Sequence, residues 1–168
     1  MVTEWLFEAL RGLPPQWVVI ILSAAPISEV RGSIPVGLAL GMPLSVILPL
    51  AVISNVVSVL PVVLCFNWVA ARLADKPVLG GLISRLIRRA RSKEAIVEKY
   101  GVFAITLFVA IPLPVTGAWT GSLVAAVFGM RFWRVVLCLT LGVSIATAIV
   151  TSLSVAGIHI FEALTVPG

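Results

Sequence analysis

Two long runs without a charged residue constrain this chain more than any other feature. Residues 44–71 form a run of 28 uncharged positions and residues 135–158 a run of 24. A helix needs about 20 apolar residues to cross the hydrocarbon core of a bilayer, so each run is long enough to span it. Charged residues make up only 11% of the 168 residues, which is too little for the surface of a soluble domain. The sequence therefore predicts an all-α integral membrane protein.

Two further apolar stretches are too short to cross and are broken by proline and glycine. Residues 17–28 end at Glu29, and residues 102–111 end at Pro112. Ten to twelve helical residues cover about 15 to 18 Å, or half of a ~30 Å hydrocarbon core. Because proline removes a backbone donor, unwound backbone at that depth must be satisfied by protein or by water in a cavity. We therefore expect re-entrant hairpins at residues 17–43 and 101–130, each followed by a transmembrane helix, at residues 44–71 and 132–158.

The distribution of charge favours this arrangement over four full crossings. With re-entrant hairpins, ten basic and three acidic residues share one face of the membrane, a balance of +7, and the other face carries one basic and three acidic residues, a balance of −2. Four full crossings would divide the basic groups between the two sides. Since cytoplasmic loops carry the excess of Lys and Arg, we predict a multi-pass protein of the cytoplasmic (inner) membrane. The basic loop 72–100 is cytoplasmic, and both termini are extracytoplasmic.

Two amphipathic segments complete a single membrane domain over residues 1–168. Residues 3–12 combine Trp, Leu and Phe with two glutamates and predict an interfacial helix. They lack a basic n-region, so we expect no cleaved secretory signal here. Residues 80–100 place leucine and isoleucine on one face and arginines on the other, which predicts a helix along the inner leaflet in contact with anionic lipid. This charge pattern is typical of interfacial helices, and nucleic acid is not an expected partner.

The two halves of the chain share one order of elements: a half-helix, a break with proline, a second half-helix ending in Gly-Met, and a full span. The Gly-Met pairs at residues 41–42 and 129–130 are 88 residues apart, and the breaks at Pro26 and Pro112 are 86 apart. One full span separates the hairpins, so they enter from opposite sides. The pattern predicts two inverted repeats, as in secondary transporters. The alternative is that the halves look alike because all membrane helices are rich in Leu, Val and Ala.

Glu29 and Arg31 are the charged residues that we expect inside the membrane. Ionisable side chains at that depth cost at least about 2.5 to 3.5 kcal/mol each on insertion scales, and they mark substrate pathways or proton relays. Burial favours the neutral form of Glu29 and Arg31 favours the carboxylate, so we expect a group that exchanges a proton near physiological pH. Arg31 suits a phosphate or carboxylate head group. The alternative is an ion pair that only fastens the hairpin tip.

Other candidates for binding substrate or proton come from both hairpins and from the first span. The second hairpin offers backbone groups at its prolines, a threonine hydroxyl and the N-terminus of a half-helix that begins near Ala118, which attracts anions. Polar residues of the spans can line a cavity or bond to a neighbouring helix. We expect no catalytic residue, metal site or cofactor; the coupling ion, if there is one, is a proton or sodium. The candidate set is Glu29, Arg31, Pro26, Pro35, Pro112, Pro114, Thr116, Gly117 and Asn55.

The sequence also resembles a known superfamily. The run Lys93 to Gly101, the segment 111–114 with sequence Ile-Pro-Leu-Pro, and the Gly-Met-Arg-Phe segment 129–132 resemble the second hairpin of DedA-type membrane proteins. Residues 26–37 are similar to the acidic, proline-rich first hairpin of the same superfamily. Over residues 17–158 the chain looks most like the family labelled "putative small multidrug export proteins", a compact relative of DedA.

This resemblance implies re-entrant hairpins with inverted symmetry and a carrier or scramblase role for lipid phosphates, including polyprenyl-phosphate carriers, with proton motive force as the driving force. It also implies that Glu29 is the membrane-embedded acid. DedA proteins flank the second-hairpin proline with arginines, whereas this chain has Val109, Ala110 and Thr116 there. Arg31 is thus the only hairpin arginine, which leaves open whether it replaces the arginines of that pattern.

We therefore expect a DedA-like transporter or flippase for an amphipathic anion, above all a lipid-linked phosphate (polyprenyl phosphate or phospholipid). One alternative is an exporter of small cationic or hydrophobic compounds, with Glu29 as counter-ion, and another is a membrane scaffold without transport. An enzyme is not expected, because one carboxylate without a paired acid or a histidine at depth provides no catalytic set. The expected partners are membrane lipids, the substrate and further copies of the chain, as a dimer or larger, since two spans are too few to shield both hairpin tips from lipid.

Overall fold

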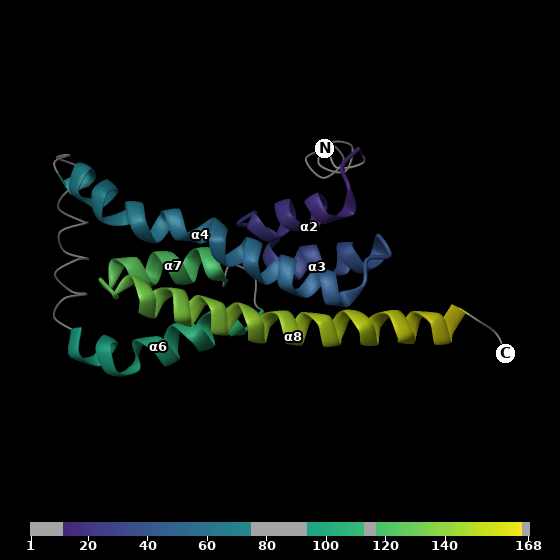
Figure 1. Cartoon of the computed structure of the whole chain (residues 1–168). Helices are drawn as coiled ribbons and strands as arrows, with labels where there is room; N and C mark the ends of the chain where they lie inside the picture. The colour runs from purple at the N-terminus through teal and green to yellow at the C-terminus, as the bar shows by residue number, and fades with distance from the viewer. Residues whose placement is uncertain (1–11, 75–93, 113–116, 166–168) are drawn as a thin grey trace. The chain divides into compact units, whose positions relative to one another are not determined.

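A computed structural model describes residues 12–74, 94–112 and 117–165 of this protein, and the regular elements in these ranges are all α-helices (Figure 1). The prediction of an all-α protein is therefore confirmed for the described residues. In chain order the helices are α2 (Pro15–Ala24), α3 (Glu29–Ala39), α4 (Leu44–Ala74), α6 (Glu94–Ala110), α7 (Ala118–Val127) and α8 (Phe132–Thr165).

Two of these helices, α4 and α8, are long and apolar enough to cross a membrane. They contain the candidate spans Leu44–Phe66 and Phe132–Phe161. On α8, large apolar side chains recur at every fourth residue on the exposed side of the helix, whereas a soluble protein would bury such a stripe. An exposed apolar surface of this kind is typical of a helix that faces lipid, which supports α8 as a candidate membrane span. The stripe consists of Leu137, Leu141, Ile145, Ile149 and Leu153.

The described residues form two compact units, each considered by itself. The first contains α2, α3, the part of α4 up to Asn55 and the part of α8 from Thr147 onward. The second contains the rest of α4 and α8, from Val56 and up to Ala146, together with α6 and α7. In each unit two short helices pack on one another, α2 on α3 and α6 on α7. Buried β-branched residues fill both cores: Val19, Val30, Ile34 and Ile47 in the first unit, and Ile105, Val109, Val135 and Val143 in the second.

The break between α2 and α3 lies at Pro26, where the sequence suggests it. The apolar stretch runs on to residue 28, but α2 ends at Ala24, and Ala25 is extended, with φ −74° and ψ 134°. The ring of Pro26 disfavours the helical conformation for the residue before it, which stops α2 at this point. Pro35, one of the candidate site residues, lies inside α3 and is exposed. A membrane helix tolerates such a proline where neighbouring groups satisfy the backbone that it frees.

The turns that end α3 and α7 contain the same backbone hydrogen bonds. The Met42 amide donates to the Gly37 carbonyl at 3.1 Å, and the Met130 amide donates to the Ala125 carbonyl at 3.1 Å. A second bond, made by the preceding glycine amide, completes a Schellman motif in each turn. These glycines have φ of +74° and +67°, a conformation that glycine adopts without a steric penalty. Corresponding residues of the two turns are 88 positions apart, the spacing of the Gly-Met pairs.

The boundary predicted at residue 100 is absent, because α6 runs without interruption from Glu94 to Ala110. The predicted amphipathic helix 80–100 and the second hairpin therefore share one helix over their described residues. A single glycine, Gly101, costs only about 1 kcal/mol within a helix, and no proline stops the chain here. The predicted interfacial helix 3–12 and residues 80–93 lie outside the described residues, except for Gly12.

Within the second unit, α6 and α8 approach closely at Gly142. A methyl group added at Gly142 would lie 2.7 Å from the Val109 Cβ atom and 2.9 Å from the Thr106 carbonyl oxygen, both on α6. Val109 is buried, and the Thr106 carbonyl belongs to the backbone and cannot rotate away. The helices α6 and α8 would therefore have to separate. Small residues at such crossings are what allow membrane helices to pack tightly.

We predict that Gly142→Ala lowers the free energy of unfolding by about 1 to 3 kcal/mol because of this overlap. Gly157→Ala is a matched control on the same helix, since nothing lies within 4 Å of a methyl group added there. That control should be neutral or stabilising, because alanine favours the helix over glycine. Thermal unfolding in detergent measures both variants, and equal midpoints for the two would contradict the close approach at Gly142.

Candidate functional site

The last turn of α2 obtains hydrogen-bond donors from outside the helix. Carbonyls in the last turn of any helix have no partner within it, and burial without one is costly. The Ser28 hydroxyl donates to the Leu22 carbonyl, and Asn55 Nδ2 donates to the Ser23 carbonyl at 2.9 Å. Because Asn55 belongs to α4, its amide ties the end of α2 to that long helix. This bond explains a fully buried amide in the middle of an apolar span.

Four buried polar side chains of the first unit form what we call the α2–α3 polar cluster: Ser23, Glu29, Ser33 and Asn55. Three of them are completely buried, and Glu29 is 7% exposed. The Ser23 hydroxyl donates to Ser33 Oγ at 2.7 Å, which joins α2 to α3. Glu29 lies four residues before Ser33 in the sequence, at the start of α3. The first unit thus buries one acid together with a hydrogen-bonded set of hydroxyl and amide groups.

Glu29 has a backbone conformation that is unusual for its side chain. Its φ is +48°, and it is the only non-glycine residue with positive φ in the described ranges. The left-handed region costs roughly 1 to 2 kcal/mol for a residue with a Cβ atom, and glycine would adopt it without that cost. Such strain is found at functional sites, where the structure around it holds the residue in place. A glutamate at this position therefore points to a role for the carboxylate.

The first unit brings five of the sequence-predicted residues together. Glu29 and Arg31 lie in the first turn of α3, and Arg31 is half-buried. Pro26 is exposed in the turn that precedes this helix. Pro35 has no N–H, so the helical bond from residue 35 to the Arg31 carbonyl cannot form. Asn55 belongs to the same unit through its bond to the end of α2, and at the start of α3 the helix dipole favours the negative charge of Glu29.

The turn between α6 and α7 belongs to the second unit and lacks charged groups in its described residues. Pro112 is half-buried and Gly117 is buried, whereas Pro114 and Thr116 lie outside the described residues. The Gly117 amide donates to Thr120 Oγ1 at 3.1 Å, and the Thr120 hydroxyl donates back to the Gly117 carbonyl at 3.2 Å. One donor at the start of α7 is therefore used within the chain.

Ser23 and Ser33 are the members of the cluster that sequence reasoning missed. Both are small hydroxyl residues in apolar surroundings, one on each side of the break at Pro26. Their position around a broken helix is the signal that could have identified them, because a break frees backbone groups that need polar partners. Thr120, three residues after Gly117, was also missed, and it too is a hydroxyl residue next to a break between helices. No group of three or more His, Cys, Asp or Glu residues that could hold a metal ion is present in the described part of the chain.

The fold and the buried acid indicate the class of this protein, and a sequence comparison then identifies its family. Two long apolar helices that are candidate membrane spans, two pairs of packed shorter helices and a buried acid are typical of an integral membrane protein. Residues 29–149 match the family described as "Putative small multi-drug export protein", and the chain belongs to this family. An export protein is a membrane transporter rather than an enzyme. No curated protein and no solved structure gives a significant match to the chain.

We predict that Asn55→Leu destabilises the protein because the Ser23 carbonyl loses its donor while staying buried. An unsatisfied buried acceptor costs about 1 to 3 kcal/mol. Asn55→Asp should also destabilise, since a carboxylate cannot donate to a carbonyl. Ser54→Ala is the control, because the bond from the Ser54 hydroxyl to the Leu50 carbonyl stays within α4 and does not join two helices. The midpoint of thermal unfolding in detergent reports the effect, and Asn55→Leu unfolding at the wild-type temperature would rule out a bond that matters for stability.

A second prediction separates the conformation of Glu29 from its charge. Glu29→Gly and Glu29→Ala both remove the carboxylate, but only glycine relieves the strain at φ +48°. We expect the glycine variant to be more stable than the alanine variant by about 1 kcal/mol, although glycine is normally the poorer residue in a helix. Chemical unfolding of the two variants side by side measures the difference. The left-handed conformation would be excluded by an alanine variant that is the more stable of the pair.

Proposed function

We propose that this protein exports small cationic or hydrophobic compounds across the membrane in exchange for protons. The observation that carries the proposal is Glu29, a buried acid held in a strained conformation at the start of α3, in a chain of an export family. Buried acids are costly in membrane proteins and lie on substrate and ion pathways. The family description supports this function better than the lipid-phosphate transport that the sequence led us to expect.

A single buried carboxylate can couple export to protons by competition. The carboxylate attracts a cation, whereas the protonated form of Glu29 is neutral and does not. Proton and compound therefore exclude one another, and a cavity that opens alternately to the two sides exchanges one for the other. Ser33, one helical turn away, offers a hydroxyl that can donate to the carboxylate or accept from the carboxylic acid. The site needs no further titratable group for this cycle.

The architecture that we propose is a pair of inverted repeats, each with a re-entrant hairpin. The helices α2, α3 and α7 have 10, 11 and 10 residues and cover about 15 to 17 Å each, half of the hydrocarbon core. The matching turns at the ends of α3 and α7 support the repeat. In this architecture Glu29 and Arg31 lie at the tip of the first hairpin, at membrane depth. A homodimer or larger assembly covers the tips that two spans leave open to lipid.

A second candidate is the transport of an amphipathic anion such as a lipid-linked phosphate. Arg31 favours it, because a half-buried guanidinium in the first turn of a helix suits a phosphate. The second hairpin weakens it, since no charged residue occurs between Gly101 and Met130 and the Gly117 amide is bonded to Thr120. A membrane scaffold without transport is the third candidate.

Efflux from reconstituted vesicles tests the leading candidate. Purified protein in vesicles with an imposed pH gradient should move a fluorescent organic cation, and Glu29→Gln should reduce the rate at least about tenfold, because a neutral amide neither exchanges a proton nor attracts a cation. Arg31→Ala should stay within about threefold of the wild type, since removing a positive charge does not weaken a cation site.

Two comparisons make this test decisive. Glu162→Gln removes an equal charge just beyond the span that ends at Phe161 and should leave efflux unchanged. A labelled polyprenyl phosphate replaces the cation in a parallel series, where transport that depends on Arg31 and not on Glu29 would establish the anion candidate instead. If wild-type protein moves neither compound, with or without the gradient, the scaffold is the remaining candidate.

The topology has its own prediction, from the positive-inside rule. In a variant with both native cysteines, Cys65 and Cys138, replaced by alanine, a cysteine introduced at Ser92 should be labelled by a membrane-impermeant thiol reagent only after the cells are opened. A cysteine introduced at Thr165 should be labelled in intact cells. If the second hairpin is re-entrant, one full crossing separates residues 92 and 165, and they lie on opposite sides of the membrane. Labelling of both positions from the same side would contradict this topology.

A further inference from the structure

A groove lies between α3 and α8 within the first unit. Its cavity volume is about 640 Å³, within the range of sites that hold drug-sized ligands. It is lined by Pro35, Leu38 and Ala39 of α3 and by four residues of α8 between Ser154 and Phe161. These stretches extend over about 6 Å of α3 and about 10 Å of α8 at the rise of a helix, so the groove is short for its volume.

Small residues keep this groove open. Gly157 is exposed, and nothing lies within 4 Å of a methyl group added to it. The glycine costs α8 about 1 kcal/mol relative to alanine, and no close contact of the backbone requires it. Ala39 adds only a methyl group to the opposite helix of the lining. The space between α3 and α8 is therefore left by residues that give the helices no packing advantage.

The wall is apolar except for one hydroxyl. Ser154 contributes this hydroxyl, and none of the lining residues is charged. A hydroxyl can donate or accept a hydrogen bond, which suits a hydrophobic compound with one polar group. Phe161 is 68% exposed, and the face of an aromatic ring attracts an organic cation. A lining without a basic side chain offers nothing comparable to an anion.

The dimensions distinguish such a compound from a bilayer lipid. An acyl chain extends through half of the ~30 Å hydrocarbon core, about 15 Å, which exceeds the length of the groove. A hydrocarbon chain would also cover the Ser154 hydroxyl without offering it a partner, and burial of a polar group on these terms is unfavourable. The groove thus fits a compact organic molecule better than an extended chain.

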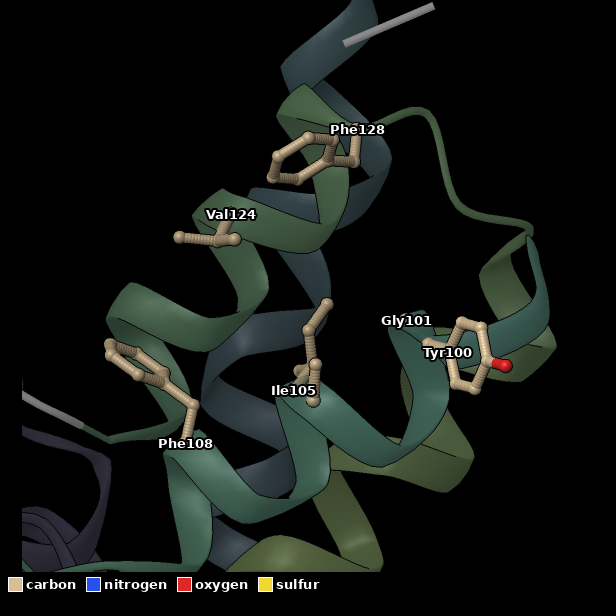
Figure 2. A pocket seen from close by; sticks show the side chains of 7 residues that line it. Tyr100, Gly101, Ile105, Phe108, Val124 and Phe128 are labelled. Carbon is tan, nitrogen blue, oxygen red and sulfur yellow. The ribbon is translucent and has the colours of Figure 1, made fainter. Parts of the chain in front are cut away.

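A second groove, between α6 and α7 in the second unit, serves as a comparison (Figure 2). Its cavity volume is about 310 Å³. The one side-chain oxygen in its wall belongs to Tyr100, and in Figure 2 this hydroxyl points away from Phe108 and Val124. The α3–α8 groove is the larger of the two, and it shares α3 with Glu29.

We propose that the α3–α8 groove binds the apolar body of the exported compound, with a hydrogen bond to Ser154 and the ring of Phe161 at its edge. The inference rests on the export function proposed above and adds the place where the hydrophobic part of the compound binds. Glu29 begins the same helix six residues before Pro35 and does not line the groove, so substitutions in the groove leave the acid in place.

The experiment measures binding and transport separately, with the full chain in lipid nanodiscs and in vesicles with a pH gradient. The probes are ethidium, whose amino groups donate hydrogen bonds, and tetraphenylphosphonium, a hydrophobic cation without a donor. Gly157→Leu should weaken the binding of both at least about tenfold, because its side chain occupies the groove. Ser154→Ala should weaken ethidium alone, by about two- to tenfold, as the loss of one hydrogen bond does. Phe161→Leu should weaken both by about two- to fivefold.

Two matched variants are the controls. Ala156→Leu places a leucine at the neighbouring exposed position of α8, which does not line the groove. Ala104→Leu narrows the α6–α7 groove instead. Both should bind the two probes as the wild type does. Thermal unfolding in detergent establishes that Gly157→Leu is folded, and Gly157→Ala, a smaller change at the same position, should weaken binding to a lesser extent.

Three results would overturn the proposal. The first is wild-type binding of both probes by folded Gly157→Leu. The second is a phospholipid that stays bound in the native mass of the wild type and is lost from Gly157→Leu while both proteins bind the probes alike, which would show that a lipid occupies the groove. The third is a change from multimer to monomer in Gly157→Leu with probe binding unaltered, which would place a second copy of the chain there.

Failure of the groove and failure of the export function give different results. Efflux and probe binding that are the same in Gly157→Leu and in the wild type would reject the groove and leave export in place. Probe binding that is lost in Gly157→Leu, in a protein that moves neither probe across the vesicle membrane, would support the groove and reject export.

Discussion

The bond from Asn55 to the end of α2 is the interaction on which the first unit depends. A helix of ten residues that ends among apolar side chains leaves carbonyls that water cannot reach. Asn55 from α4 and Ser28 from the following turn provide the donors, and the bond between Ser23 and Ser33 closes the pair of short helices. Once α2 can end there, the chain can turn at Pro26 and begin α3 with Glu29. The polar cluster thus satisfies the backbone at the end of α2, and it lies in the unit that also buries Glu29.

The two units solve the same packing problem with different chemistry. In the first, the side chains of Ser23, Ser33 and Asn55 join α2, α3 and α4 by hydrogen bonds, and α3 begins with the strained Glu29. In the second, Val109 fits between Gly121 and Gly142, and the Thr106 hydroxyl donates to the Cys138 carbonyl at 3.5 Å, so that apolar contact is joined by one hydrogen bond between α6 and α8. The turns that lead from α3 to α4 and from α7 to α8 are nevertheless the same, down to two hydrogen bonds each. A shared frame with one polar and one mainly apolar version suits a protein that needs a single charged site rather than two.

Much of this could be predicted from particular residues, and the failures have physical causes. The charge-free runs predicted α4 and α8, and Gly117 with Ala118 predicted where α7 begins. The break at Pro26 was expected, and its effect on Ala25 ends α2 at Ala24 although the apolar pattern runs on to residue 28. The continuity of α6 through Gly101 was missed, because a single glycine does not stop a helix. Ser23 and Ser33 could not be singled out, since their importance comes from facing one another across ten residues of sequence.

By itself the sequence determined the class of the protein, because the length of an uncharged run and the cost of a charge in hydrocarbon are local properties of the chain. It also determined that Glu29 and Arg31 are exceptional, for the same reason. Only the tertiary structure decided which groups accompany Glu29, which carbonyl Asn55 satisfies and where α6 and α7 leave a groove. These depend on contacts between segments distant in the chain, and neither hydropathy nor spacing specifies which side chain meets which backbone group.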